Sequence, residues 1–223
     1  MASRRSPPDV GRSRQNETDE FAAWLVSTAG AQLPRDADAL LSEVARPLSS
    51  DELRQALAGS AGVLTYDEAF PDSPEARGWD LRAELARWPA RALVFLYRQT
   101  PTFGHWIAIF DRGDDLYVFD PYGQTPPDAW GAGRPAQDLE SLGQDRPRLL
   151  GAMLRANYRA IEWNDIPLQY PDQSVQTCGR WAVTRIAGRS LGVDEFADAI
   201  LSAARALGVS TDALVCGIVP ARG

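Results

Sequence analysis

The chain contains no lysine: all 23 of its basic residues are arginine, against 30 aspartates and glutamates. A bias toward GC-rich codons is the first explanation, because Ala, Arg, Gly and Pro are abundant. A chain without lysine also cannot carry ubiquitin on a lysine side chain, which would suit a protein that acts inside a eukaryotic host cell. The formal net charge of −7 argues against broad nucleic-acid binding.

Cysteine and long apolar runs are scarce as well. The two cysteines, Cys178 and Cys216, provide no disulfide framework, which favours a reducing compartment. No apolar run approaches the roughly 20 residues that span a bilayer, and residues 1–20 contain no apolar core of a secretory signal. We therefore expect an intracellular protein without a membrane partner. The apolar fraction of 44% is enough for one ordinary globular core.

The pattern along the chain predicts one domain preceded by a tail. Residues 1–19 are polar and without periodicity, so we expect a disordered tail, followed by a single domain over residues 20–223. Amphipathic patterns predict a short helix that opens at Phe21 and further helices over residues 36–46, 51–58, 80–87, 148–158, 180–187 and 194–207. Ser49 or Ser50 is expected to cap the third of these helices.

Short apolar runs predict strands over residues 92–97, 106–110, 116–119 and 160–163. The Gly- and Asp-rich segment 111–115 predicts a hairpin between the second and third strands. Residues 124–147 have the composition of a surface excursion, and residues 164–177 that of a loop. The predicted fold class is α+β, with a small mixed sheet flanked by helices.

Three side chains fit nucleophilic catalysis. His105, the only histidine, begins one strand of the predicted hairpin, and Asp120 follows its antiparallel partner, so both lie at the same end of the sheet. Cys178 lies where a loop meets a helix, and free N–H groups there favour the thiolate and provide one arm of an oxyanion hole. Gly179 permits a tight turn beside it. The order His, Asp, Cys provides a base, an orienting carboxylate and a nucleophile. Cys216, in an apolar segment, is expected to be inert and buried.

A resemblance to a known superfamily is carried by three strings, GHWIAIF, VFDPYG and TCGRW. In this order they resemble the superfamily of the adenovirus protease (adenain) and the SUMO- and ubiquitin-like-protein-specific cysteine proteases, over roughly residues 90–190. The resemblance implies a circularly permuted papain-like fold. His105 and Asp120 match the family's histidine and acidic residue, and Cys178 matches its nucleophile.

The resemblance also implies the kind of substrate. Trp106 matches the tryptophan that usually follows the histidine and roofs a narrow channel, and Gly179 belongs to the family's Cys-Gly pair. We therefore expect cleavage after Gly-Gly or Gly-X in a viral precursor or a ubiquitin-like modifier conjugate. The protein would act in the cytoplasm or nucleus of a host cell, or be packaged in a virion. No metal or cofactor is implied.

One part of the family pattern is displaced. The family usually has an oxyanion-hole glutamine six or seven residues before the cysteine, but that window here holds Pro171 and Asp172. The nearest glutamines are Gln169 and Gln173. We favour Gln169, because a loop accommodates an insertion of two residues more readily than a change in the residues that flank the glutamine. Gln173, which is nearer in spacing, stays the alternative.

Other protein classes share parts of this pattern. In chymotrypsin-like viral cysteine proteases the catalytic residues also follow the order His, Asp, Cys along the chain. Their two β-barrels need many evenly spaced strands. The helices predicted before and after the sheet segment of this chain exclude that fold. YopJ-like acyltransferases share the triad and the acyl-enzyme step, so they remain an alternative. A non-catalytic binding module on the same fold is disfavoured because all three residue types are present. The sequence predicts a cysteine protease that hydrolyses peptide or isopeptide bonds.

Overall fold

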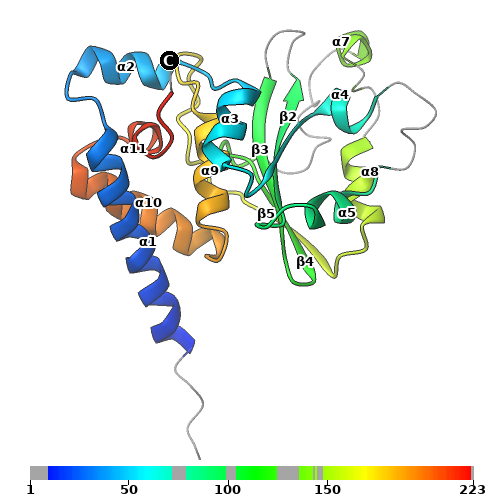
Figure 1. Ribbon diagram of the computed structural model, residues 1–223, viewed down its shortest axis with the longest axis horizontal. Coiled ribbons are helices and arrows are strands. Elements are labelled where there is room, and N and C mark those ends of the chain that lie inside the picture. The colour runs from blue at the N-terminus through cyan, green and yellow to red at the C-terminus, as the bar shows by residue number, and fades with distance from the viewer. Residues whose placement is uncertain are drawn as a thin grey trace, which may run out of the picture.

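A five-stranded sheet in the order β1-β2-β3-β4-β5 forms the centre of the fold. In the computed structural model, which describes residues 10–71, 79–98, 104–124, 136–142, 144 and 148–221, the chain is α+β, as the sequence predicts (Figure 1). The strands are β1 (Gly62–Thr65), β2 (Ala92–Arg98), β3 (Gly104–Arg112), β4 (Asp115–Phe119) and β5 (Ala160–Trp163). The outer strands β1 and β5 run parallel to their neighbours, and β2, β3 and β4 are joined antiparallel.

Helices cover both faces of this sheet. They are α1 (Val10–Gln32), α2 (Ala37–Ala45), α3 (Ser50–Leu57), α4 (Tyr66–Ala69), α5 (Leu81–Ala86), α7 (Ala136–Ser141), α8 (Arg148–Arg155), α9 (Cys178–Ala187), α10 (Val193–Leu207) and α11 (Thr211–Ile218). In the described ranges no single helix is long and apolar enough to cross a membrane; α10 and α11 satisfy that test only as a pair, bent by 91°.

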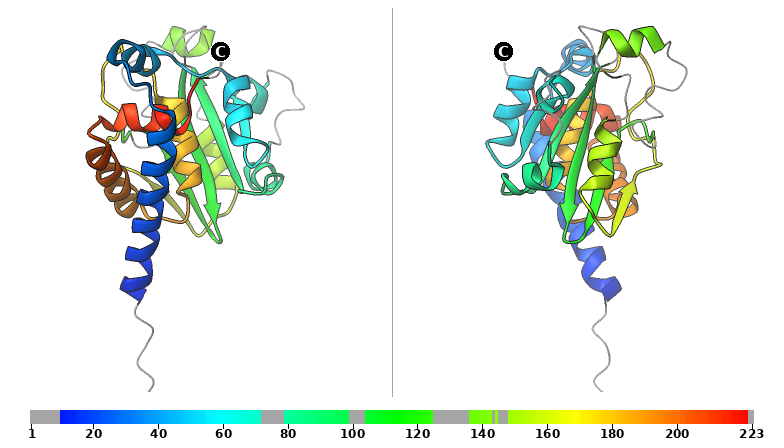
Figure 2. Two further views of the ribbon diagram at one scale, coloured as in Figure 1. Left: turned by 60° about the vertical axis from the view of Figure 1, so that its left-hand side comes forward. Right: turned by 90° about the vertical axis from the view of Figure 1, so that its right-hand side faces the viewer.

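The strands separate two buried clusters, because successive side chains point to opposite faces of a sheet. On one face, Val94 and Ala108 pack in a cluster with helices α1, α3, α9, α10 and α11. Helix α9 lies between the sheet and α1, α10 and α11, whereas α3 lies beside α9 and contacts β1 directly (Figures 1 and 2). On the other face, Phe95 and Ile107 pack against α4, α5 and α8. The first cluster contains Cys178, so the helix that carries this thiol is anchored directly on the sheet.

The predicted strands are confirmed to within two residues at their ends. β3 and β4 form the expected hairpin, with Ala108 opposite Phe119, and Gly113 in its turn has a φ of +68° that favours glycine. Strand β1 was not predicted from the sequence. This strand of four residues pairs parallel with β2, starting at Gly62 opposite Leu93, so its strand character depends on a partner 31 residues away.

Six predicted helices (α2, α3, α5, α8, α9 and α10) are confirmed to within three residues. Ser49 is the cap of α3, in a capping box with Glu52. The expectation of a disordered tail is wrong for residues 10–19, which belong to α1. Arg, Gln and Glu there have good helix propensity even though no apolar periodicity reveals it. Residues 1–9, and much of the predicted excursion 124–147, lie outside the described residues; α4, α7 and α11 were not predicted.

Candidate active site

The hairpin brings the only histidine to a carboxylate. His105 is the second residue of β3 and Asp120 is the first residue after β4, and His105 Nε2 lies 2.8 Å from Asp120 Oδ1. Both side chains are buried. The register of the hairpin ends with Ala108 opposite Phe119, and a turn closed by the Gly123 N–H on the Asp120 carbonyl oxygen follows β4. The hairpin therefore brings Asp120 to the end of the sheet where β3 begins with His105.

Hydrogen bonds hold Asp120 at its carboxylate and at its main chain. The Tyr122 N–H donates to Asp120 Oδ1 (2.8 Å), the oxygen that also faces His105. Asn164, just after β5, accepts from the Asp120 N–H at Oδ1 (2.7 Å) and donates from Nδ2 to the Asp120 carbonyl oxygen (2.6 Å). In the described part of the chain, Asp120 Oδ2 has no hydrogen-bond partner. The carboxylate is thus held with Oδ1 facing the imidazole of His105.

Cys178 is the first residue of α9, with Thr177 as the N-cap residue. The Thr177 side chain does not cap the helix, because its hydroxyl donates to Asp212 Oδ1 (2.5 Å). The first N–H groups of a helix have no intrahelical acceptor and form the positive end of its dipole. The backbone around Cys178 therefore offers uncapped N–H groups to an anion, whether that anion is a thiolate or an oxyanion.

Electrostatics link the three side chains. Burial alone would lower the pKa of His105, but the charge and hydrogen bond of Asp120, with a further contribution from Cys178, raise it to about 10. The raised pKa of His105 favours the charged imidazole at neutral pH. Because Nε2 faces Asp120, Nδ1 is the ring nitrogen that remains for the sulfur. We call His105, Asp120 and Cys178 the His–Asp–Cys site.

Trp106 and Gly179 lie beside the nucleophile and contact each other. A Cβ added at Gly179 would come within 3.2 Å of Trp106 Cδ1 and 3.2 Å of Leu53 Cδ2. A side chain at position 179 therefore fits only if the Leu53 or Trp106 side chain gives way by a few tenths of an ångström. Trp106 is 5% exposed, so the indole is mostly covered by α3 and α9.

Gln169 is buried close to this site, whereas Gln173 is exposed. Gln169 Nε2 donates to Tyr122 Oη (3.1 Å) and to the Val175 carbonyl oxygen (3.1 Å). Its loop is docked by backbone bonds, because the N–H groups of Leu168 and Gln169 both donate to the Pro121 carbonyl oxygen. The structure thus brings Gln169, and not Gln173, next to the residues that follow Asp120.

Tyr122, the tyrosine of the string VFDPYG, was not predicted as a site residue. Its ring stacks on the His105 imidazole, with ring centroids 4.7 Å apart and planes inclined by 20°. Burial, together with the negative charges of Cys178, Asp120 and Asp212, raises the pKa of Tyr122 to about 12. The string VFDPYG places Tyr122 two residues after Asp120, and this short spacing is the sequence signal that could have indicated the contact.

Asp212, in the first turn of α11, is a second residue that the sequence analysis missed. Besides Thr177, its buried carboxylate accepts from Trp181 Nε1 (2.9 Å) and from the Tyr170 N–H (3.0 Å). It therefore ties the loop that carries Gln169 to the helix that carries Cys178. No sequence signal indicates this role, because the partners lie 31 to 42 positions away.

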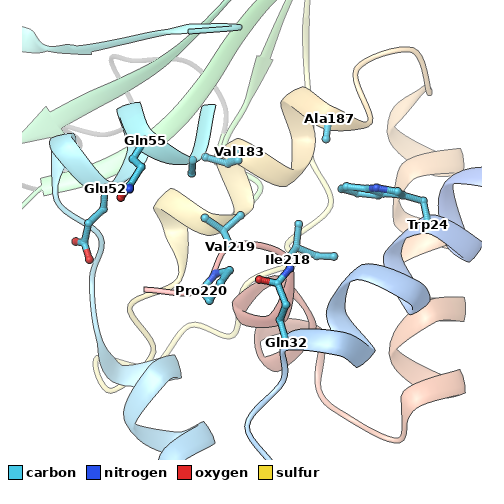
Figure 3. Close-up of a pocket in the computed structure, with 10 residues that line it drawn as sticks. Trp24, Gln32, Glu52, Gln55, Val183, Ala187, Ile218, Val219 and Pro220 are labelled. Atoms are coloured by element: carbon cyan, nitrogen blue, oxygen red, sulfur yellow. The ribbon is translucent and has the colours of Figure 1, made fainter. Parts of the chain in front are cut away.

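Other parts of the described chain do not extend the site. No group of three His, Cys, Asp or Glu side chains in these residues could hold a metal ion. A groove of about 220 Å³ lies elsewhere, between α1, α3, α9 and the segment after α11, with Trp24, Val183, Val219 and Pro220 in its lining (Figure 3). None of the three residues of the His–Asp–Cys site lines this groove, so it is a separate feature.

The fold and the site define an α+β protein in which a histidine lies between a carboxylate and a cysteine at a helix N-terminus. No family model matches the chain. Over 109 residues it is 29% identical to a protein of the Sputnik virophage that carries the name uncharacterized protein V9. The alignment covers 48% of this chain and 61% of the virophage protein, so the chain spans less than two thirds of that relative. This similarity assigns no activity.

Proposed function

We propose that this protein is a cysteine protease with the circularly permuted papain-like arrangement that its motifs resemble. One observation carries the proposal: the only histidine of the chain is buried against a carboxylate, and both that carboxylate and Cys178 raise its pKa. A charged imidazole beside a thiol at an uncapped helix N-terminus is the environment of a reactive cysteine.

The mechanism follows from the order of these groups. Cys178 Sγ, as a thiolate, bonds to the carbonyl carbon of the scissile amide, and the electron pair of the C=O bond moves to the oxygen. The intermediate collapses as the C–N bond breaks, and the leaving nitrogen takes the proton of the His105 imidazolium. Water then attacks the thioester, with His105 accepting its proton, and releases the acid and the thiolate. Asp120 holds the imidazole in place throughout.

The proposed substrate is a protein chain with glycine before the scissile bond, either a viral precursor or a ubiquitin-like modifier conjugate. The similarity to a virophage protein supports a viral setting, and the preference for glycine is what the resemblance implies for Trp106. Action in the cytoplasm or nucleus of a host cell, or within a virion, belongs to the same proposal.

Hydrolysis tests this proposal directly. Ubiquitin and SUMO, each carrying a C-terminal coumarin amide, and a peptide coumarin amide ending in Gly-Gly are incubated with the protein and with its Cys178→Ala and Cys216→Ala variants. We expect coumarin release from at least one of these by the unchanged protein and by Cys216→Ala, and none by Cys178→Ala. Release by Cys178→Ala, or no release from any of them, contradicts the proposal.

A further inference from the structure

The hydrogen bonds of Gln169 leave its amide without a free proton. The Val175 carbonyl oxygen can only accept, so the amide atom 3.1 Å from it must be the nitrogen. The same nitrogen lies 3.1 Å from Tyr122 Oη. An NH₂ group carries two protons, and these two bonds use both. While they hold, Gln169 has nothing to donate to a substrate.

The same bonds leave the hydroxyl proton of Tyr122 without an acceptor. In its bond with Gln169 the hydroxyl oxygen accepts, and a hydroxyl has one proton of its own to donate. The nearby oxygens Asp120 Oδ2 and Gln169 Oε1 have no hydrogen-bond partner, so neither of them takes this proton. Within the described ranges, Tyr122 is therefore a donor whose oxygen is anchored and whose proton is unused.

The position of Tyr122 relates this donor to the nucleophile. Its ring covers one face of the His105 imidazole, and its N–H is bonded to Asp120. Through Gln169 its hydroxyl is connected to Val175, three residues before Cys178. The charge of Cys178 also contributes to the raised pKa of Tyr122, about 12, so the hydroxyl keeps its proton at neutral and mildly alkaline pH.

Resting on the proposed protease function, we propose that the Tyr122 hydroxyl is an oxyanion donor of this site and that Gln169 is a positioning residue that holds it. When Cys178 Sγ bonds to the carbonyl carbon, the negative charge develops on the carbonyl oxygen. The Cys178 N–H and the Tyr122 O–H donate to that oxygen, and no proton leaves Tyr122. As the intermediate collapses, both hydrogen bonds weaken and the leaving amine takes its proton from His105.

The test separates the hydroxyl from the ring. Tyr122→Phe keeps the ring that stacks on His105 and removes only the O–H. For a peptide coumarin amide ending in Gly-Gly, we expect kcat to fall about a hundred- to thousandfold with little change in KM, which is the usual effect of losing one oxyanion donor. Alkylation of Cys178 by iodoacetamide forms no oxyanion, so its rate should stay within about twofold. Tyr158→Phe, which removes the hydroxyl that donates to Asp111 (2.9 Å), is the matched control and should keep the unchanged kcat.

A double-mutant cycle tests the role of Gln169. If Gln169 acts through Tyr122, the Tyr122→Phe, Gln169→Ala double variant hydrolyses the peptide no more slowly than Tyr122→Phe. The inference is overturned if Tyr122→Phe stays within about threefold of the unchanged kcat, or if alkylation slows as much as hydrolysis. It is also overturned if Gln169→Ala removes a further hundredfold in the Tyr122→Phe background. Each of these results leaves Cys178 as the nucleophile, whereas hydrolysis by Cys178→Ala would overturn the proposed function itself.

Discussion

Replacing Asp120 by Asn should lower the pKa of the only histidine. In the unchanged protein, burial alone would lower the pKa of His105, but the Asp120 carboxylate offsets burial and, with Cys178, raises it to about 10. Asparagine keeps the shape of the side chain and removes its charge. Because an opposite charge within hydrogen-bond distance moves a pKa by about 1–3 units, we expect a decrease of that size in Asp120→Asn.

The same interaction makes stability depend on pH. A histidine whose pKa rises from 6.5 to about 10 on folding contributes stability that is fully present below pH 6.5. This contribution is lost as pH rises through about 10. One pKa unit corresponds to about 1.4 kcal/mol, so the contribution of His105 is on the order of a few kcal/mol. In Asp120→Asn, the decrease in unfolding free energy attributable to His105 should be correspondingly smaller over this pH window.

Nuclear magnetic resonance can follow this titration without assignment, because the chain has one imidazole. With ¹³C-labelled histidine, the ring signals report the pKa of His105, and urea unfolding at each pH reports stability. Cys178→Ala provides a comparison, and we expect it to lower the pKa of His105 less than Asp120→Asn does, because Asp120 is the larger cause. A folded protein whose imidazole titrates near 6.5, or whose titration is the same in Asp120→Asn, would refute the reasoning.

Three further predictions concern the surroundings of the nucleophile. Burial raises the pKa of Cys216 to about 12. Iodoacetamide at mildly acidic pH should therefore label Cys178 well before Cys216, as mapped by peptide mass spectrometry. The reverse order of labelling would contradict the assignment of Cys178 as the nucleophile. Asp212→Ala leaves three donors without their buried acceptor. It should lower the free energy of unfolding, measured by chemical denaturation, by about 3 kcal/mol or more. A decrease below about 1 kcal/mol would mean that this carboxylate does not hold the loop to α9. Trp106→Ala should slow hydrolysis and weaken the preference for glycine in a peptide library that is varied at the two positions before the scissile bond. Efficient cleavage after large residues by the unchanged protein would contradict a narrow channel.

The local pattern predicted the parts of the fold in which neighbouring residues determine the structure. The alternating strands, the Gly- and Asp-rich turn at Gly113 and the capped helix after Ser49 all depend on contacts within a few positions. The pairing of His105 with Asp120 was predictable for the same reason, because a tight hairpin fixes the register. β1 was missed because its partner, β2, lies about thirty residues further along the chain.

The parts of the site that were missed depend on contacts between distant segments. Asn164 reaches the backbone of Asp120 from 44 positions away, and Asp212 reaches Thr177 from 35. Local pattern carries no information on such pairs. Gln169 was singled out from sequence, but its two hydrogen bonds become visible only when the loop is seen docked on Pro121. The role of Tyr122 follows from that docking.

The central claim is that Cys178 is the nucleophile of an amide-cleaving enzyme, and covalent capture tests it most directly. Ubiquitin, SUMO and a peptide ending in Gly-Gly, each with a C-terminal electrophile in place of the scissile amide, are incubated with the protein, and any adduct is mapped by mass spectrometry. The account predicts a single adduct on Cys178 with at least one of these tails, unchanged in Cys216→Ala and strongly slowed in Asp120→Asn. An adduct on Cys216, or no adduct with any tail from protein whose Cys178 still reacts with iodoacetamide, would contradict it.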